Sequence, residues 1–124
     1  MELEMYSRDI LDAIIKVFDE HGEKVGGYTD YNGRAIRVSG RYGTNFWIRV
    51  APWYDGLFIN LSSVNIRKSI RRQGIFTEIC RRISEKSYTK LVIIENPVTT
   101  EMHNFAKKHN LRFECERNRY IVKE

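Results

Sequence analysis

The chain has 124 residues, 42% of them hydrophobic, which is the size of one domain that buries about two-thirds of its unfolded surface. Its formal net charge of +5 favours anionic partners, such as a coenzyme, a nucleic acid or an acidic protein surface. No apolar run approaches the roughly 20 residues of a membrane-spanning helix, and the N-terminus is acidic and amphipathic, unlike a signal peptide. Cys80 and Cys115 fit no metal-binding spacing. We therefore expect a cytoplasmic protein with a single domain, residues 1–124, and with no metal or membrane segment.

The first segment, residues 3–21, predicts an amphipathic helix. Five apolar residues share one stripe at helical spacing: Ile10, Leu11, Ile14, Ile15 and Phe18. Ser7 is the expected N-cap and Gly22 the expected end of the helix. The stripe predicts a buried face, to which we assign no function.

Two strand-like segments follow, at residues 24–31 and 34–39. They are separated by Asn32-Gly33, which is a strong hairpin signal. Residues 46–50 alternate apolar and polar side chains, which predicts a further strand. A third hairpin strand is therefore expected before residue 54.

Tyr54-Asp55-Gly56 predicts a turn, and residues 57–66 predict the returning strand. The apolar pattern weakens at Ser62 and Ser63, where a strand bulges or leaves its ladder. Backbone groups left unpaired at such a strand end can bind a ligand. Most aromatic residues of this hairpin are expected in the core, while Trp53 and Tyr54, beside the turn, are candidates for a contact surface.

The most informative stretch is Arg71-Arg72-Gln73-Gly74-Ile75-Phe76-Thr77, which leads into a helix predicted over residues 75–85. The free N–H groups at a helix N-terminus, together with the positive end of the helix dipole, bind phosphates. Arg71 and Arg72 add positive charge at that place. Arg81 and Arg82 are expected on a solvated face of the helix instead.

The apolar run at residues 91–94 predicts a strand buried on both faces, and the helical crossover before it predicts a parallel pairing with residues 57–66. Pro97 ends this strand, and Thr99 or Thr100 caps a last helix that reaches His109. Asn110 is expected in the left-handed conformation that ends a helix. Residues 111–115 and 120–122 predict a closing hairpin.

The order of these elements resembles the GNAT (GCN5-related N-acetyltransferase) family. That family carries an Arg/Gln-x-x-Gly-x-Gly/Ala turn between its fourth strand and the next helix, and here the turn runs from Arg71 to Phe76. The resemblance covers residues 46–122 as an acyl-CoA-binding core and leaves residues 1–45 as a shortened, variable part. A Gly-Ile-Phe-Thr turn is common in small bacteriophage-encoded proteins of this kind, which implies a phage protein in the host cytoplasm.

The implied fold is α+β, with a mixed central sheet that is mostly antiparallel, a splayed parallel strand pair and three flanking helices. The implied ligand is acetyl-CoA, CoA or another acyl-CoA. By this analogy the pantetheine arm pairs with the backbone at Val64 and Ile66, and Arg71 and Arg72 neutralise the pyrophosphate. The backbone amides that would hold the pyrophosphate belong to Gln73, Gly74, Ile75, Phe76 and Thr77.

Three positions depart from the family pattern. Phe76 replaces a small residue, and it is tolerated if it points into the core but crowds the phosphates if it points at them. Ala106 stands where the family often has a tyrosine that protonates the departing thiolate, and Thr99 stands where asparagine is frequent. General-acid help of about 10²- to 10⁴-fold in rate must then come from another group or is missing. The substitutes that the sequence offers are His103, Tyr88 and Tyr120.

Two residues are candidates for catalysis. Glu95 ends the buried strand, a preferred position for active groups in open α/β sheets, where it can act as a base or bind a basic substrate. The alternative for Glu95, and for Asn96 beside it, is a solvated strand end. His103 lies on the helix expected to line the acyl site, with a surface position as its alternative; His21 and His109 are expected at the surface.

Three functions remain open. The first is an N-acyltransferase that acts on an amine of a small molecule or protein. The second is a protein of the same fold that has lost catalysis and binds a host protein, which Ala106 and Phe76 favour. The third is a role in binding or modifying DNA, which rests on net charge alone. The resemblance also allows a homodimer.

Overall fold

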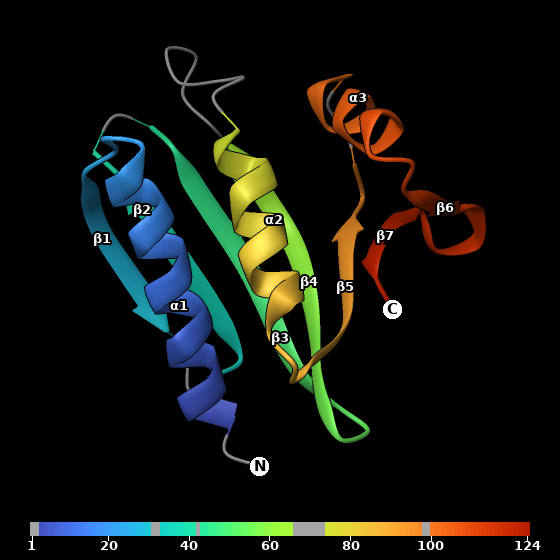
Figure 1. Cartoon of the computed structure of the whole chain (residues 1–124), viewed down its shortest axis with the longest axis horizontal. Helices are drawn as coiled ribbons and strands as arrows, with labels where there is room; N and C mark the ends of the chain where they lie inside the picture. Colours follow the sequence, from blue (N-terminus) through green and yellow to red (C-terminus); the bar gives the residue numbers. More distant parts are fainter. Residues whose placement is uncertain (1–2, 31–32, 42, 66–73, 98–99) are drawn as a thin grey trace.

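Three helices and a seven-stranded sheet make up the computed structural model of this chain (Figure 1). The structure describes residues 3–30, 33–41, 43–65, 74–97 and 100–124. The helices are α1 (Leu3–Glu20), α2 (Ile75–Glu85) and α3 (Thr100–Lys108). The strands are β1 (Val25–Asp30), β2 (Ala35–Gly40), β3 (Asn45–Trp53), β4 (Gly56–Asn65), β5 (Thr89–Glu95), β6 (Arg112–Glu114) and β7 (Arg119–Lys123), with a 3₁₀ turn, η2 (Cys115–Arg117), between the last two.

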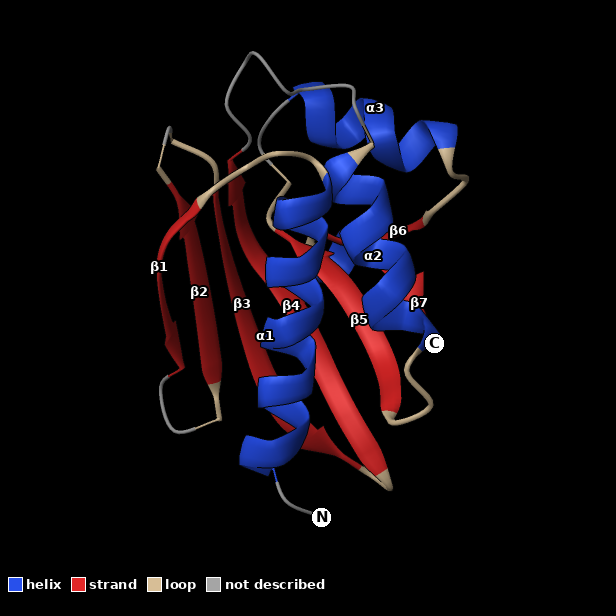
Figure 2. Ribbon diagram, turned by 60° about the vertical axis from the view of Figure 1, so that its left-hand side comes forward, coloured by secondary structure: helices blue, strands red, loops and turns tan. Residues whose placement is uncertain are grey.

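The sheet has the order β1-β2-β3-β4-β5-β7-β6. Within the described residues β4 and β5 are parallel, joined through α2, and the other neighbouring strands are antiparallel. The predicted α+β fold, a mostly antiparallel mixed sheet with one parallel pair and three helices, is therefore confirmed. Figure 2 shows α1 and α2 lying side by side over one face of the sheet, with α3 across its upper end.

Helix α1 forms as predicted, but its N-cap prediction is wrong. The helix already begins at Leu3, so Ser7 lies inside it. The Ser7 hydroxyl is buried and donates a 2.6 Å hydrogen bond to the carbonyl oxygen of Gly33, at the start of the β2 side of the first hairpin. Ser7 therefore does not cap the helix. Its hydroxyl connects the helix to a distant loop, through a hydrogen bond to Gly33 and not to the local backbone.

Helix α2 has the predicted bounds, because one face of the helix is apolar and the opposite face carries paired charges. The apolar stripe is buried against the sheet and consists of Ile75, Phe76, Ile79, Cys80 and Ile83. On the polar side Glu78 accepts hydrogen bonds from Arg81 and Arg82, and these bonds lower the pKa of Glu78 to about 2. Arg81 and Arg82 thus belong to the charged outer face of the helix, as predicted.

The hydrophobic core lies between the helices and the covered face of the sheet. A second, smaller cluster lies on the opposite face, where Leu91 and Ile93 of β5 contact Ile121 of β7 and Phe58 of β4. Strand β5 is therefore buried on both faces, as its continuous apolar run predicted. None of the helices in the described part of the chain is both long and apolar enough to cross a membrane.

Candidate functional site

Strands β4 and β5 diverge at one end. Their parallel ladder ends with the pair Leu61 and Ile94. Beyond it β4 continues beside β3, with Val64 opposite Phe46, whereas β5 continues beside β7, with Glu95 opposite Arg119. Residues 62–65 of β4 therefore have no partner on β5, and backbone groups on such a strand edge need hydrogen-bond partners from outside that ladder.

The predicted bulge lies at the same place. Trp47 of β3 faces Ser63, and the next residue, Ile48, faces Leu61, so Ser62 is the extra residue. A bulge bends its strand and raises its twist, which turns the end of β4 away from β5. The weak apolar pattern at Ser62 and Ser63 correctly marked this position.

Helix α2 begins beside this splayed end. Phe76, in its first turn, stacks on Phe46 with ring centroids 6.0 Å apart, and Phe46 is the register partner of Val64. Gly74 precedes the helix in the left-handed conformation, with φ of 79°, and as the N-cap residue it offers no side-chain hydrogen bond to the first turn. The N–H groups of a first helical turn can bind an anion.

Phe76 points into the core. Its side chain is 7% exposed and contacts Phe105 of α3, with ring centroids 4.6 Å apart, as well as Phe46. It therefore does not crowd a ligand at the helix N-terminus. Ile75 is buried beside it and Thr77 is exposed, while four predicted ligand contacts lie outside the described residues: Ile66, Arg71, Arg72 and Gln73.

Glu95 faces the side of the sheet that α1 and α2 do not cover. Its carboxylate accepts a hydrogen bond from the side-chain amide of Asn60, which is 7% exposed on β4. The amide oxygen of Asn60 is buried and has no hydrogen-bond partner among the described residues. The Glu95 carboxylate is an acceptor at the end of β5, and an acceptor there suits the N–H groups of an amine.

Asn60 was missed in the sequence because a single polar residue within an apolar strand carries no motif. The neighbouring Asn96 has a structural role. Asn96 and Asn118 both have positive φ, and the side-chain amide of Asn118 donates to the side-chain oxygen of Asn96 at 3.2 Å. The backbone N–H of Asn96 also donates to the carbonyl of Asn118, so the pair ties the end of β5 to the turn before β7.

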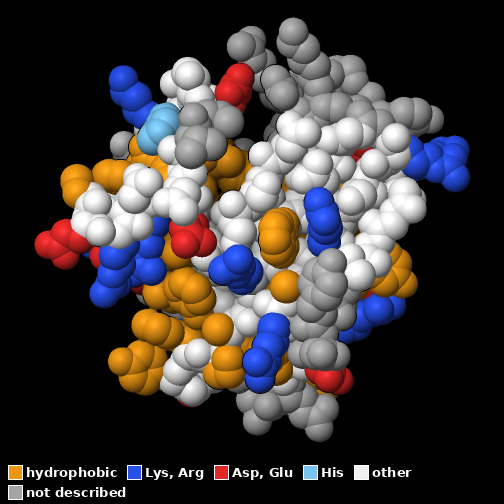
Figure 3. Space-filling model, turned by 180° about the vertical axis from the view of Figure 1, so that it is seen from behind, with side chains coloured by type: hydrophobic (Ala, Val, Ile, Leu, Met, Phe, Trp, Pro, Cys, Tyr) orange, Lys and Arg blue, Asp and Glu red, His pale blue; other side chains and the backbone are white. Residues whose placement is uncertain are grey.

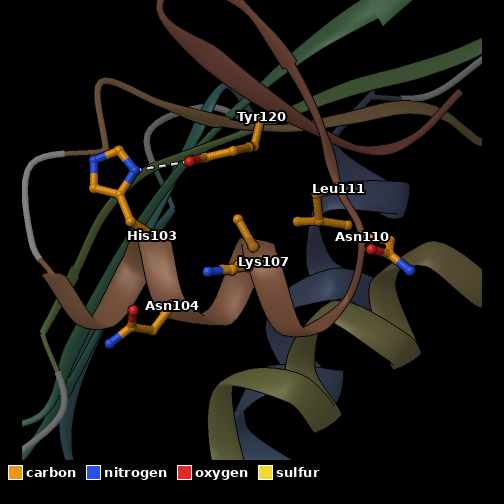
Figure 4. A pocket seen from close by; sticks show the side chains of 7 residues that line it. His103, Asn104, Lys107, Asn110, Leu111 and Tyr120 are labelled. Carbon is orange, nitrogen blue, oxygen red and sulfur yellow. Dashed lines mark hydrogen bonds between the residues drawn. The ribbon is translucent and has the colours of Figure 1, made fainter.

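His103 and Tyr120 form a second polar pair, on the helix-covered side. Nδ1 of His103 lies 2.7 Å from the hydroxyl oxygen of Tyr120, and the tautomer of the imidazole decides which of them donates. The two side chains point toward each other and line a pocket of about 490 Å³ together with other residues of α3 (Figure 4). Ala106 lines the same pocket and is fully buried, so Tyr120 supplies a hydroxyl close to the position where the family often has a tyrosine.

Glu95 and the His103–Tyr120 pair are not brought into contact. Tyr120 is the register partner of Ile94, and side chains of successive strand residues point to opposite faces, so Glu95 lies on the other side of β5 from Tyr120. The two candidate catalytic residues therefore approach the end of β5 from opposite faces of the sheet.

The remaining candidates lie elsewhere. Tyr88 directly precedes β5, at the end of that strand far from Glu95, and its hydroxyl donates to Asp9 of α1. Burial, followed by the Asp9 carboxylate, raises the pKa of Tyr88 well above its ordinary value. His109 is exposed, and its ring centroid lies 4.5 Å from that of Phe105. Tyr88 is therefore not placed to protonate a group at the splayed strand end.

No protein-family model matches this sequence, and no curated protein matches it. The functional interpretation therefore rests on the order of the sequence motifs and on the geometry of the strand ends.

Proposed function

We propose that this chain is an acyl-CoA-dependent N-acyltransferase of the GNAT type. The observation that carries the proposal is the divergence of β4 and β5 beyond Leu61 and Ile94, with the first turn of α2 and its N-cap Gly74 beside it. An extended ligand arm can add to the free edge of β4 near Val64 through backbone hydrogen bonds, each worth about 1 kcal/mol. Phosphates can then bind at Gly74, Ile75 and Thr77.

The acyl-CoA supplies an activated carbonyl, and the chain supplies binding and proton transfer. The amine nitrogen forms a bond to the carbonyl carbon, the bond from that carbon to sulfur breaks, and the amine loses a proton. Glu95, with Asn60 beside it, binds the amine and accepts that proton. Tyr120, hydrogen-bonded to His103, gives a proton to the departing thiolate.

The opposite placement of these groups suits the reaction. An amine that approaches from the side of Glu95 leaves the helix-covered side to the thiolate. Glu95 then only accepts a proton and Tyr120 only donates one, so neither group has to act as both base and acid. This division explains why the two candidates need not touch each other.

The test is acyl transfer with purified protein. Release of free thiol from acetyl-CoA is measured with and without a panel of amines: polyamines, aminoglycosides, and peptides with a free N-terminus or lysine. The proposal predicts amine-dependent thiol release that is lost in an Arg71→Ala/Arg72→Ala variant. Amine-independent release alone, or full activity of that variant, would overturn it.

A second function is favoured by Ala106. This residue is fully buried where the family often has its catalytic tyrosine, and it has no hydroxyl to donate. A chain that binds acyl-CoA without turnover would act by docking on another protein, with the coenzyme as a structural ligand. Coenzyme binding together with no thiol release for any amine would favour this second function.

A further inference from the structure

The face of the sheet opposite the helices carries no helix in the described part of the chain, as Figure 2 shows. We call it the open sheet face. Figure 3 views it directly and shows Lys and Arg side chains spread among hydrophobic ones. The side chains that point to it and carry the argument below are Arg37, Trp47, Arg49, Trp53, Phe58 and Lys90.

Two arginines of this face lie beside Trp47. It is 37% exposed, and the guanidinium carbons of Arg37 and Arg49 each lie 5.8 Å from the centre of its ring system. Arg37 is its cross-strand partner on β2, and Arg49 follows two residues later on β3. The sheet register therefore places two cations next to one partly exposed aromatic ring.

A second aromatic group lies further along β3. Trp53 is 39% exposed and contacts Tyr54, which is 93% exposed, and Phe58, with ring centroids 5.3 and 5.7 Å away. Trp47 and Trp53 share one side of β3, and at about 3.3 Å per residue they stand roughly 20 Å apart. A single extended ligand chain can contact both rings.

The charge of this face favours an anion. In the described part of the chain no ion pair engages Arg37 or Arg49, so both guanidinium groups keep their donors for a ligand. The acidic groups of the face each contact a basic or amide side chain. They are Asp55, which faces Lys90 at 4.0 Å, Glu95, which accepts from Asn60, and Glu114 and Glu124, which pair with Arg119 and Arg112.

A hollow of about 300 Å³ extends the face next to Trp53. Leu91 and Ile121 form its apolar part, and Lys90, Arg117 and Arg119 line it together with Glu114 and Glu124, which are paired with Arg119 and Arg112. Basic and aromatic side chains therefore continue from β2 across β3 to this hollow, whose carboxylates are ion-paired. This continuity distinguishes the face from a single exposed tryptophan.

We infer that the open sheet face binds single-stranded nucleic acid, with bases stacked on Trp47 and Trp53 and phosphates held by Arg37, Arg49 and Lys90. Proteins that bind single strands combine aromatic rings on which bases stack with cations that follow the backbone. A duplex hides its bases from rings on a flat sheet, so a single strand fits this face better. The inference does not depend on the acyltransferase proposal, since none of these five residues belongs to the coenzyme site.

The chain provides its own probe for this binding. Its two tryptophans, Trp47 and Trp53, both lie on the open sheet face, so stacked bases should quench the intrinsic tryptophan fluorescence. The protein is titrated with a poly-dT oligonucleotide of about 15 nucleotides, the upper range of single-strand site sizes, at low and at physiological salt. Trp53→Phe leaves Trp47 as the single reporter.

Trp47→Ala should weaken binding about 5- to 150-fold, which is the range for loss of one stacked base. Arg37→Ala/Arg49→Ala should lower the slope of log affinity against log salt by about 1.4, because each single-strand phosphate contact contributes about 0.7. The matched control is Arg8→Ala, which removes an arginine that lies 5.4 Å from the Tyr28 ring on the helix-covered side. Arg8→Ala should bind oligonucleotide like the unchanged protein.

Three results would overturn the inference. One is no quenching at low salt. Another is equal affinity of Trp47→Ala and the unchanged protein. The last is a duplex or an acidic peptide that binds more tightly than the single strand and protects the same residues, since the occupant would then be of another class.

Discussion

The hydroxyl oxygen of Tyr120 lies 2.7 Å from Nδ1 of His103, which joins the closing strand β7 to helix α3. Ala106, on the same helix, lines the pocket between them. Tyr120 of β7 thus supplies a hydroxyl to the pocket that Ala106 of α3 also lines, and Ala106 itself has no hydroxyl. This relationship makes Tyr120 the strongest candidate for protonating a leaving thiolate.

Tyr120→Phe removes the hydroxyl and keeps the ring that contacts Phe113 at 4.9 Å. We expect kcat to fall about 10²- to 10⁴-fold, the usual worth of a general acid, with unchanged affinity for CoA. Steady-state kinetics and calorimetry measure the two quantities. The control, His109→Gln, alters an exposed histidine directly after the same helix and should leave kcat unchanged. Full turnover by Tyr120→Phe would make the pair structural only.

Glu95→Gln replaces the carboxylate by an amide of the same shape. The variant can neither accept a proton nor attract an ammonium group, so kcat/KM for the amine should fall at least tenfold. Affinity for acyl-CoA should not change, because Glu95 lies on the other side of β5 from the pocket. A variant that loses CoA affinity and keeps its amine kinetics would contradict this assignment.

Phe76→Ala should destabilise the fold by about 3 to 5 kcal/mol, the usual cost of deleting a buried phenylalanine. Its ring lies between those of Phe46 and Phe105 and connects α2 to β3 and α3. Urea unfolding monitored by circular dichroism measures the change. Thr77→Ala, at the exposed next position, should change stability by no more than about 0.5 kcal/mol. A loss below 1 kcal/mol in Phe76→Ala would show that this aromatic contact contributes little.

Stability should fall in acid partly through Asp9. A hydrogen bond from Tyr88, and then Lys86, holds the pKa of Asp9 below its ordinary value. A carboxyl whose pKa is lower in the folded state contributes stability above its unfolded pKa of about 3.9, and this is lost as the pH falls through the folded value. Asp9→Asn should therefore lower stability at neutral pH and flatten the decline below about pH 4.

Urea unfolding at neutral pH and near pH 3 measures that decline. Asp12→Asn is the control, since Asp12 lies on the same helix at an exposed position 3.6 Å from Arg8. Equal acid sensitivity of Asp9→Asn and the unchanged protein would show that Asp9 contributes no pH dependence.

Local signals in the sequence were sufficient for most elements. The apolar stripe predicted the bounds of α2, Asn110 has the expected positive φ, and the weak pattern at Ser62 and Ser63 marked the bulge. These features depend on residues close together in the chain. Ser7 failed as an N-cap because its partner, the carbonyl of Gly33, is distant in sequence.

The candidate site was only partly predictable for the same reason. Strand alternation places Trp47 opposite the core face, but it does not tell whether a helix covers that side, so its exposure was not foreseen. The contacts of Glu95 with Asn60 and of His103 with Tyr120 join residues of different elements. Such pairings follow from sheet order, which no single stretch of sequence encodes.

The most direct test of the central claim is calorimetric titration with acetyl-CoA and CoA, together with thermal unfolding. We expect micromolar binding and a stability gain of about 2.7 kcal/mol at a ligand concentration 100 times Kd. Binding should disappear in Arg71→Ala/Arg72→Ala and persist in Arg81→Ala/Arg82→Ala, which loses the same charge from the ion-paired face of α2. No binding at millimolar ligand, or equal binding by both double variants, would contradict the coenzyme site.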